Sequence, residues 1–233
     1  MKYLVSAGLN RISINYYGTD GLLRGCVNDV INVRDFFQPN DYIMLLNEEA
    51  TVGNFVSAVR EYSKVAQAGD TVILNYSGHG TQVSSTKEND KLAEAFCFYD
   101  KILLDKQFSN LVAEFKEGVN VIAFVDSCHS GGISRLPNPT DKYKTKAITL
   151  SYNSRDVNTL KPIKCSYLGL LACGEQQVAM DGTQNGLFTE TMISNYKNQD
   201  FITWLKESGK KVTAQTFTYK TYGKKADWKK IKL

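Results

Sequence analysis

The sequence predicts an α/β fold in which a mostly parallel central sheet is covered by helices on both faces. Two observations predict it. The segments "TVILNYSGHG" and "VNVIAFVDSCHSGG" are apolar runs that end in glycine-containing loops, which is the pattern of buried parallel strands. Segments with apolar residues at helical spacing alternate with such runs, as they do in successive strand-helix-strand units.

The elements of the first half follow in order. An apolar run from Tyr3 to Val5 begins almost at the first residue, so we expect little regulatory segment ahead of the domain. Residues 27–37 have the apolar spacing of a helix, which Pro39 ends. A short strand is expected at 41–46, and Thr51 is placed to cap the helix that follows.

Strands are expected at 72–74 and 121–125, with a helix at 108–115 between them that Gly118 closes as a C-cap. The run "SYLGLLACG" predicts a third buried strand, and residues 187–193 return to helical spacing. The segment 134–164 is weakly patterned and rich in Pro, Asn, Ser and basic residues, which indicates a linker. We expect the whole chain, 1–233, to form a single domain.

Composition limits the classes of function. With 42% hydrophobic and 22% charged residues, the 233-residue chain is typical of a globular protein. The formal charge of +4 comes largely from a lysine-rich C-terminal segment, which is interpreted as solvated surface, with nucleic acid or an anionic membrane as the alternative. Five cysteines without a dense framework indicate a reducing compartment, so we expect a cytoplasmic protein without membrane or nucleic-acid partners.

The residues that carry chemistry follow two of the predicted strands. His79 and Cys128 each lie in the loop after a strand, and the carboxyl ends of neighbouring parallel strands open onto one crevice. A cysteine thiol attacks only as thiolate, so it needs a nearby imidazole or other positive influence. His79 lies 49 residues before Cys128, which agrees with the order in caspase-type peptidases.

A structural reading competes with this one, since His79 could be an ordinary polar loop residue and Cys128 a small buried thiol. A zinc site is disfavoured because Cys128 and His129 are adjacent and the chain has no C-x-x-C spacing.

The motifs "YSGHG" and "DSCHSGG" resemble the His and Cys motifs of the metacaspases. The segments "LRGCVND", "EAFCFYD" and "LLACGEQQVAMD" extend the resemblance over most of the chain. It implies a caspase-like three-layer sandwich with a sheet of about six strands. It also implies a large-subunit-like region at 1–133, a linker at 134–164 and a small-subunit-like region at 165–233.

By this resemblance the chain is a cysteine endopeptidase in which Cys128 is the nucleophile and His79 the general acid and base. The backbone N–H groups of Gly80 and Cys128 would hold the oxyanion, because preorganised donors stabilise the charge that develops on the scissile carbonyl. The sequence does not identify a third catalytic residue, an acid that would orient His79.

Metacaspases prefer Arg or Lys before the scissile bond, and the resemblance places four residues in the pocket that receives it. These are Cys26, Asp29, Ser77 and Asp126. Two carboxylates in a partly desolvated pocket favour a cation, whereas caspases use an arginine where this chain has Leu23. The competing interpretation makes Asp126 a turn cap and Asp29 a solvated helix residue.

Three further expectations concern regulation. Many metacaspases bind calcium through aspartates, but this chain has Ala93 and Arg135 at matching positions and Asp105 alone elsewhere, so no metal is expected and calcium is predicted to be dispensable. The linker is expected to be exposed and open to self-cleavage, and the chain is expected to be a monomer. The candidate cleavage sites are Arg135, Lys142, Lys144, Lys146, Arg155, Lys161 and Lys164.

Two other functions stay open. One is a clostripain-like or gingipain-like peptidase, which also combines a His-Gly loop, a later cysteine and basic specificity. The other is a caspase-fold module that has lost activity and serves as a binding or scaffold domain. Intact His79 and Cys128 count against the second.

Overall fold

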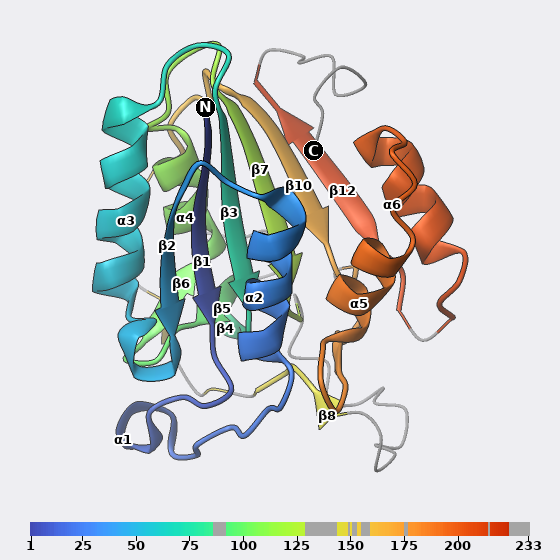
Figure 1. The fold of residues 1–233 in the computed structure, drawn as a ribbon. Coiled ribbons are helices and arrows are strands. Elements are labelled where there is room, and N and C mark those ends of the chain that lie inside the picture. Colours follow the sequence, from blue (N-terminus) through green and yellow to red (C-terminus); the bar gives the residue numbers. More distant parts are fainter. Residues whose placement is uncertain are drawn as a thin grey trace.

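The computed structural model describes residues 1–85, 92–128, 144–148, 150, 153–154, 159–174, 177–213 and 215–223. A six-stranded sheet in the order β12-β10-β7-β3-β1-β2 forms its centre (Figure 1). Its strands are β1 (Lys2–Gly8), β2 (Asp41–Leu46), β3 (Thr71–Ser77), β7 (Asn120–Asp126), β10 (Ser166–Leu171) and β12 (Thr218–Tyr222). All neighbours are parallel except β12, which runs antiparallel to β10.

Helices cover both faces of this sheet (Figure 1). One face packs against α3 (Val52–Val65) and α4 (Asp105–Val112), and the other against α2 (Cys26–Phe37), α5 (Leu187–Ser194) and α6 (Phe201–Gly209). Successive side chains of β3 alternate between the two cores, with Val72 and Leu74 in the first and Ile73 in the second. Burial on both faces explains the continuous apolar runs, and the predicted three-layer α/β fold is confirmed.

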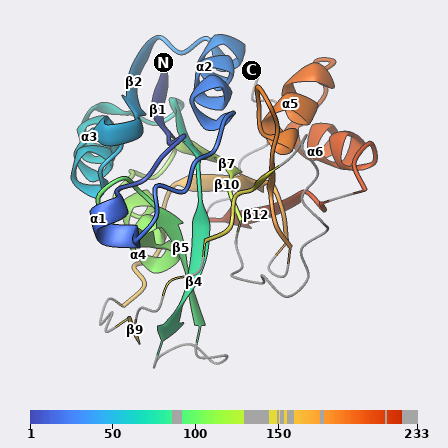
Figure 2. The same cartoon turned by 90° about the horizontal axis from the view of Figure 1, so that it is seen from below.

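A second sheet projects from the carboxyl end of the first (Figure 2). It has the order β6-β5-β4-β9 and the sequence did not predict it. Its strands are β4 (Gly80–Ser85), β5 (Leu92–Cys97), β6 (Ile102–Leu104) and β9 (Asn153–Ser154). Because β4 begins at Gly80, directly after His79, this sheet fixes the histidine loop.

Short elements complete the fold. A two-stranded ladder joins β8 (Lys144–Thr145) to β11 (Met180–Asp181). The helix α1 (Ile14–Tyr17) and the 3₁₀ helix η1 (Asn47–Glu49) lie in the loops after β1 and β2.

Most predicted elements are confirmed. Thr51 caps α3 through its side chain, which accepts a hydrogen bond from the Asn54 N–H at 3.1 Å. The predicted role of Gly118 is wrong: α4 ends at Val112, and Gly118 lies in the later turn before β7 with φ of 85°. A Cβ there would lie 2.6 Å from Ala68, so glycine permits close contact between two loops.

All five cysteines are free and buried. In the part of the chain that the structure describes, no helix combines the length and apolar character needed to cross a lipid bilayer.

Candidate active site

The structure brings the loops that carry His79 and Cys128 together at the carboxyl edge of the central sheet. Strands β3 and β7 are neighbours, and their last paired residues are Ser77 and Asp126. His79 lies two residues after Ser77, and Cys128 lies two residues after Asp126. Gly80 packs directly on the second loop, where a Cβ would lie only 1.8 Å from the Cys128 carbonyl oxygen. Any larger residue would therefore push the two loops apart.

His79 is held by a backbone carbonyl. Its Nε2 lies 2.6 Å from the Gly21 oxygen, and since a carbonyl only accepts, Nε2 carries the proton. Its Nδ1 forms no hydrogen bond to any described residue. Burial lowers the pKa of His79, although backbone groups of Gly21 and Lys146 oppose that shift. Burial therefore favours the neutral imidazole, with its proton on Nε2.

The sequence could not reveal this orienting partner, because a main-chain oxygen leaves no residue signature. The loop that contains Gly21 lies between β1 and α2, and the buried Asp181 carboxylate on β11 holds it in place. That carboxylate accepts the N–H groups of Arg24 at 2.7 Å and Gly25 at 3.1 Å. Asp181 therefore helps to position His79 through the loop that carries Gly21.

Cys128 is buried, with 2% of its surface exposed. The Ala179 N–H donates a hydrogen bond of 3.0 Å to its Sγ. Burial raises the pKa of the Cys128 thiol well above its ordinary value, and the neighbouring Cys173 thiol adds to this shift. In this conformation Cys128, the predicted nucleophile, is covered, and its environment favours the protonated thiol.

The four residues predicted to form the substrate pocket, Cys26, Asp29, Ser77 and Asp126, are all fully buried. Ser77 Oγ donates a 2.6 Å hydrogen bond to Asp29 Oδ2. Cys26 opens α2, one turn before Asp29 on the same helix. The alternative in which Asp29 is solvated is wrong, since this carboxylate is inaccessible to water.

Residues from the small-subunit-like region close the pocket, and the sequence did not identify them. The Gly186 N–H donates to Asp29 Oδ1 at 2.8 Å, and the Asn185 side chain donates to the same oxygen at 3.0 Å. Thr189 donates to Asp126 Oδ2 through its N–H at 3.0 Å and its hydroxyl at 2.8 Å. Each carboxylate therefore keeps one oxygen facing the interior of the pocket.

The pocket holds a lysine of the same chain. Lys146 Nζ lies 3.0 Å from Asp29 Oδ2 and 3.0 Å from Asp126 Oδ1, and its side chain is 0% exposed. Its remaining hydrogen bonds reach Ser77 Oγ at 2.9 Å and the Asp126 carbonyl at 3.3 Å. The expectation of an exposed linker is therefore wrong at Lys146, because two carboxylates draw its ammonium into the interior.

The main chain around Lys146 is also engaged. The Lys146 N–H donates to the Ala179 carbonyl at 3.0 Å, and its own carbonyl accepts from the Gly80 N–H at 2.8 Å. The Ile148 N–H donates to the Gly80 carbonyl at 3.1 Å. Strand β8, just before Lys146, thus lies at the carboxyl end of the central sheet (Figure 1).

Two of the positions considered for calcium, Ala93 and Asp105, lie among the described residues. Ala93 is buried on β5 and offers only a methyl group, and Asp105 lies in the first turn of α4. Arg135 lies outside the described residues, as do Lys142 and Arg155. No group of three or more His, Cys, Asp or Glu side chains suited to a metal ion occurs among the described residues.

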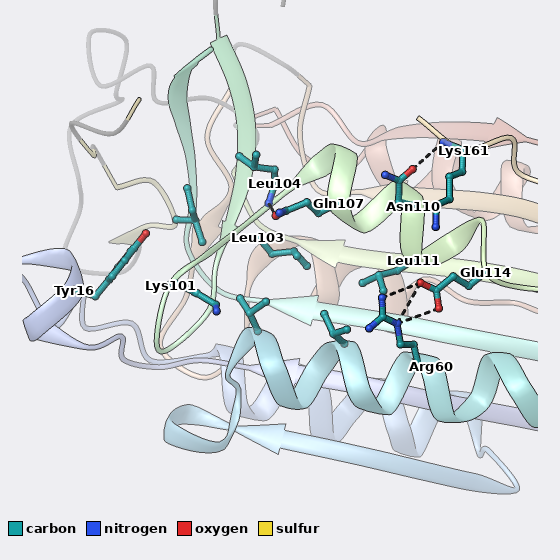
Figure 3. Close-up of a pocket in the computed structure, with 13 residues that line it drawn as sticks. Tyr16, Arg60, Lys101, Leu103, Leu104, Gln107, Asn110, Leu111, Glu114 and Lys161 are labelled. Carbon is teal, nitrogen blue, oxygen red and sulfur yellow. Dashed lines mark hydrogen bonds and ion pairs between the residues drawn. The ribbon is translucent and has the colours of Figure 1, made fainter. Parts of the chain in front are cut away.

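A separate pocket of about 650 Å³ lies beside α3 and α4 (Figure 3). The ion pair between Arg60 and Glu114, 3.2 Å long, lines it, as do Asn110 and Lys161. None of its lining residues belongs to the catalytic or substrate-binding set.

Comparison with known proteins agrees with this geometry. The family described as metacaspase, peptidase C14 domain, matches residues 11–137. Metacaspase-1 of Mycosarcoma maydis is 30% identical over 211 residues, which cover 82% of this chain and 50% of that protein. Metacaspase-1 of Saccharomyces cerevisiae is 32% identical over 156 residues, which cover 59% of this chain and 35% of that protein. The chain thus spans half or less of the length of these curated relatives.

A crystal structure of a protein from Geobacter sulfurreducens has the same fold, with a TM-score of 0.82 and 24% sequence identity. The similarity covers 97% of this chain and 95% of that one. The matched domain spans more than half of the sequence and includes both loops that meet at the sheet edge, and the chain therefore belongs to the metacaspase family.

Proposed function

We propose that this protein is a cysteine endopeptidase that cleaves peptide bonds after Lys or Arg. The observation that carries the proposal is the ammonium of Lys146 between the carboxylates of Asp29 and Asp126. A desolvated pocket with two carboxylates attracts a cationic side chain and repels an anionic one. Its depth accommodates a complete lysine side chain.

The proposed catalytic roles are those that the family resemblance implies, and the convergence of the two loops supports them. In an open site, His79 Nδ1 accepts the proton of Cys128, and the thiolate attacks the substrate carbonyl. The N–H groups of Gly80 and Cys128 stabilise the oxyanion, and the Gly21 carbonyl keeps the imidazole oriented. His79 then protonates the leaving amine, and water hydrolyses the thioester. Each of these steps uses groups that converge at the ends of β3 and β7.

The direct test is hydrolysis of fluorogenic peptides ending in Arg, Lys or Asp, after the protein has been incubated until any self-cleavage is complete. We expect turnover of the Arg and Lys peptides only, and no turnover by Cys128→Ala. Equal hydrolysis of the Asp peptide would rule out the proposed specificity. Turnover by Cys128→Ala would rule out the proposed nucleophile.

A matched pair of variants tests the pocket. Asp29→Asn should lower kcat/KM for Arg peptides by about 10- to 100-fold, since a hydrogen bond to a charged group is worth about 1.5–3 kcal/mol. Asp35→Asn is the control, because Asp35 lies on the same helix with its side chain 60% exposed. A similar loss in both variants would contradict the proposed role of Asp29.

A further inference from the structure

We propose that Cys128 and Cys173 form a reversible disulfide when a peroxide oxidises Cys128, and that Cys173 is the resolving cysteine of this pair. The inference rests on the proposed function, in which Cys128 is the nucleophile, and it assigns a redox modification to the same site. Cys173 lies in the small-subunit-like region and takes no part in the proposed hydrolysis.

The central sheet places Cys173 beside the loop that carries Cys128. Strand β10 runs parallel to β7, and their last paired residues are Leu171 and Val125 (Figure 1). The hydrogen bonding continues past this pair, because the Ala172 N–H donates to the Val125 carbonyl at 3.0 Å. Cys173 is the next residue, so it leaves the edge of the sheet where the Cys128 loop begins.

The contacts of the Cys173 side chain show that the two thiols are neighbours. Its Sγ lies within hydrogen-bond distance of two carbonyl oxygens, that of Ser127 at 3.6 Å and that of Gln177 at 3.4 Å. It also reaches the next residue after Ser127, since a hydrogen bond between the two thiols contributes to the raised pKa of Cys128. Neighbouring strands lie about 4.7–4.9 Å apart, and a disulfide joins residues whose Cα atoms are about 4.4–6.8 Å apart. The strand spacing therefore falls within the range that a disulfide requires.

The other three cysteines have different surroundings. Cys128 and Cys173 pack in the same apolar cluster, on the face of the sheet that α2, α5 and α6 cover. Cys97 and Cys165 pack in the cluster on the opposite face, and Cys26 lies in the predicted substrate pocket. Cys173 is therefore the thiol placed to react with Cys128.

Burial keeps this pair reduced in the closed conformation. Cys128 and Cys173 are 2% and 1% exposed, and burial raises the pKa of the Cys128 thiol. Oxidation by a peroxide follows thiolate character and exposure. It therefore requires the same two events as the proposed hydrolysis, which are opening of the site and transfer of the Cys128 proton to His79. The disulfide forms in the working enzyme, and closed molecules are spared.

The oxidation balances with hydrogen peroxide as the oxidant. The Cys128 thiolate attacks one peroxide oxygen, the O–O bond breaks, and the leaving hydroxide takes the proton from His79 and becomes water. Cys128 is then a sulfenic acid, oxidised by two electrons. The Cys173 thiol attacks the Cys128 sulfur, the S–O bond breaks, and the second hydroxide leaves with the Cys173 proton as water. A dithiol reverses the bond by exchange and is itself oxidised to a disulfide.

Peptide mapping tests the bond directly. Reduced protein, prepared as for the peptide assay, is treated with hydrogen peroxide, denatured in iodoacetamide and digested without reductant. We expect two peptides linked through Cys128 and Cys173, with the loss of two hydrogens, that separate when dithiothreitol is added. This measurement does not depend on hydrolysis of any substrate.

Recovery of activity tests the role of Cys173. After excess peroxide, dithiothreitol should return wild type to within about twofold of its own starting activity. Cys173→Ala should stay at least about tenfold below its own, because without a resolving thiol Cys128 proceeds to sulfinic and sulfonic acids that thiols do not reduce. If Cys173→Ala does not fold, Cys173→Ser replaces it.

Cys165→Ala is the matched control. Cys165 is also buried and lies just before β10, but it packs on the opposite face of the sheet, with its Sγ 3.6 Å from the Val112 carbonyl. This variant should form the disulfide and recover like wild type.

The outcomes separate the two hypotheses. If reduced protein hydrolyses Arg and Lys peptides but peroxide produces no bond between Cys128 and Cys173, the inference is wrong and the proposed function stands. A disulfide from Cys128 to another cysteine, or equal recovery of wild type and Cys173→Ala, would also overturn the inference alone. If reduced protein hydrolyses neither peptide, the proposed function fails, and the inference that the disulfide switches this activity fails with it.

Discussion

The charged side chains of Lys146, Asp29 and Asp126 form one buried cluster. The protonation state of each therefore depends on the charges of the other two. Burial alone would lower the pKa of Lys146, but the carboxylates of Asp126 and Asp29 outweigh this effect and hold it well above its ordinary value. Lys146 is therefore a full cation in this structure. Removal of one partner from a buried ion pair typically costs about 3–5 kcal/mol, so substitution of Lys146 would leave two buried carboxylates without their cation.

Gly186 forms one wall of this pocket. A Cβ at this position would lie 2.3 Å from Asp126 Oδ2 and 2.5 Å from Lys146 Nζ. We predict that Gly186→Ala lowers kcat/KM for Arg and Lys peptides by about 100-fold, since displacement of about 1 Å in an active site can have that effect. The measurement is steady-state hydrolysis with peptides of both kinds.

Gly53→Ala serves as the control, because its Cβ would meet nothing closer than Thr51 Oγ1 at 3.9 Å. This change within α3 should leave hydrolysis unchanged and stabilise the helix by about 1 kcal/mol. Full activity of Gly186→Ala would show that the pocket is wider than described.

The depressed pKa of His79 predicts a specific pH dependence of stability. The unfolded chain binds a proton at His79 below its ordinary pKa of 6.5, whereas the folded chain binds one only at lower pH. The stability is therefore fully present above pH 6.5 and is lost as the pH falls from there toward the folded pKa. Acidification should weaken the fold through this residue.

Comparison with His79→Gln isolates this effect from other titrating groups. We expect the free energy of unfolding of wild type, relative to His79→Gln, to be smaller at about pH 5.5 than at about pH 7.5. Urea denaturation at both pH values measures it. An unchanged difference would mean that the imidazole titrates normally in the folded protein.

At the scale of elements, the site depends on loops from both ends of the chain. Strand β11 supplies Asp181 to the loop before α2, and α5 supplies Thr189 to the end of β7. The first of these contacts joins residues 157 positions apart in the sequence, and the second joins residues 63 positions apart. The small-subunit-like region therefore stabilises the geometry of the catalytic loops.

Asp181→Ala tests this dependence. It would leave the part-buried N–H of Arg24 and the buried N–H of Gly25 without their acceptor, and an unsatisfied buried group costs about 1–3 kcal/mol. We predict a loss of that size in urea denaturation, together with a lower kcat as the loop that orients His79 loosens. Asp20→Ala in the same loop is the control, since Asp20 is exposed and should tolerate the change.

At the scale of the whole molecule, the parallel neighbours β3 and β7 place the loops of His79 and Cys128 at the same edge of the central sheet. Calcium is proposed to play no part there, because the positions aligned with the family's aspartates include the buried methyl group of Ala93. We predict that excess chelator leaves the activity within about twofold of its value with calcium, since no cluster of three or more acidic, His or Cys side chains suited to a metal ion lies among the described residues. Loss of activity in chelator and recovery with calcium would refute this.

The sequence by itself determined the α/β class and most of the central elements. Their signals are local: continuous apolar runs for strands buried on both faces, and helical spacing for α2, α3 and α5. It also determined the family, because the motifs around His79 and Cys128 are contiguous. The roles of these residues stay predictions until the variants are measured.

Only the tertiary structure decided which groups meet. The Gly21 carbonyl that orients His79 has no side-chain signature, and Asp181 lies about 100 residues beyond His79, in a segment whose resemblance to the family did not indicate this contact. Lys146 was one of seven basic residues in the linker. Two aspartates from different elements, Asp29 and Asp126, together stabilise its buried ammonium. These residues are remote from Lys146 in sequence, so no local pattern could predict that it lies between them.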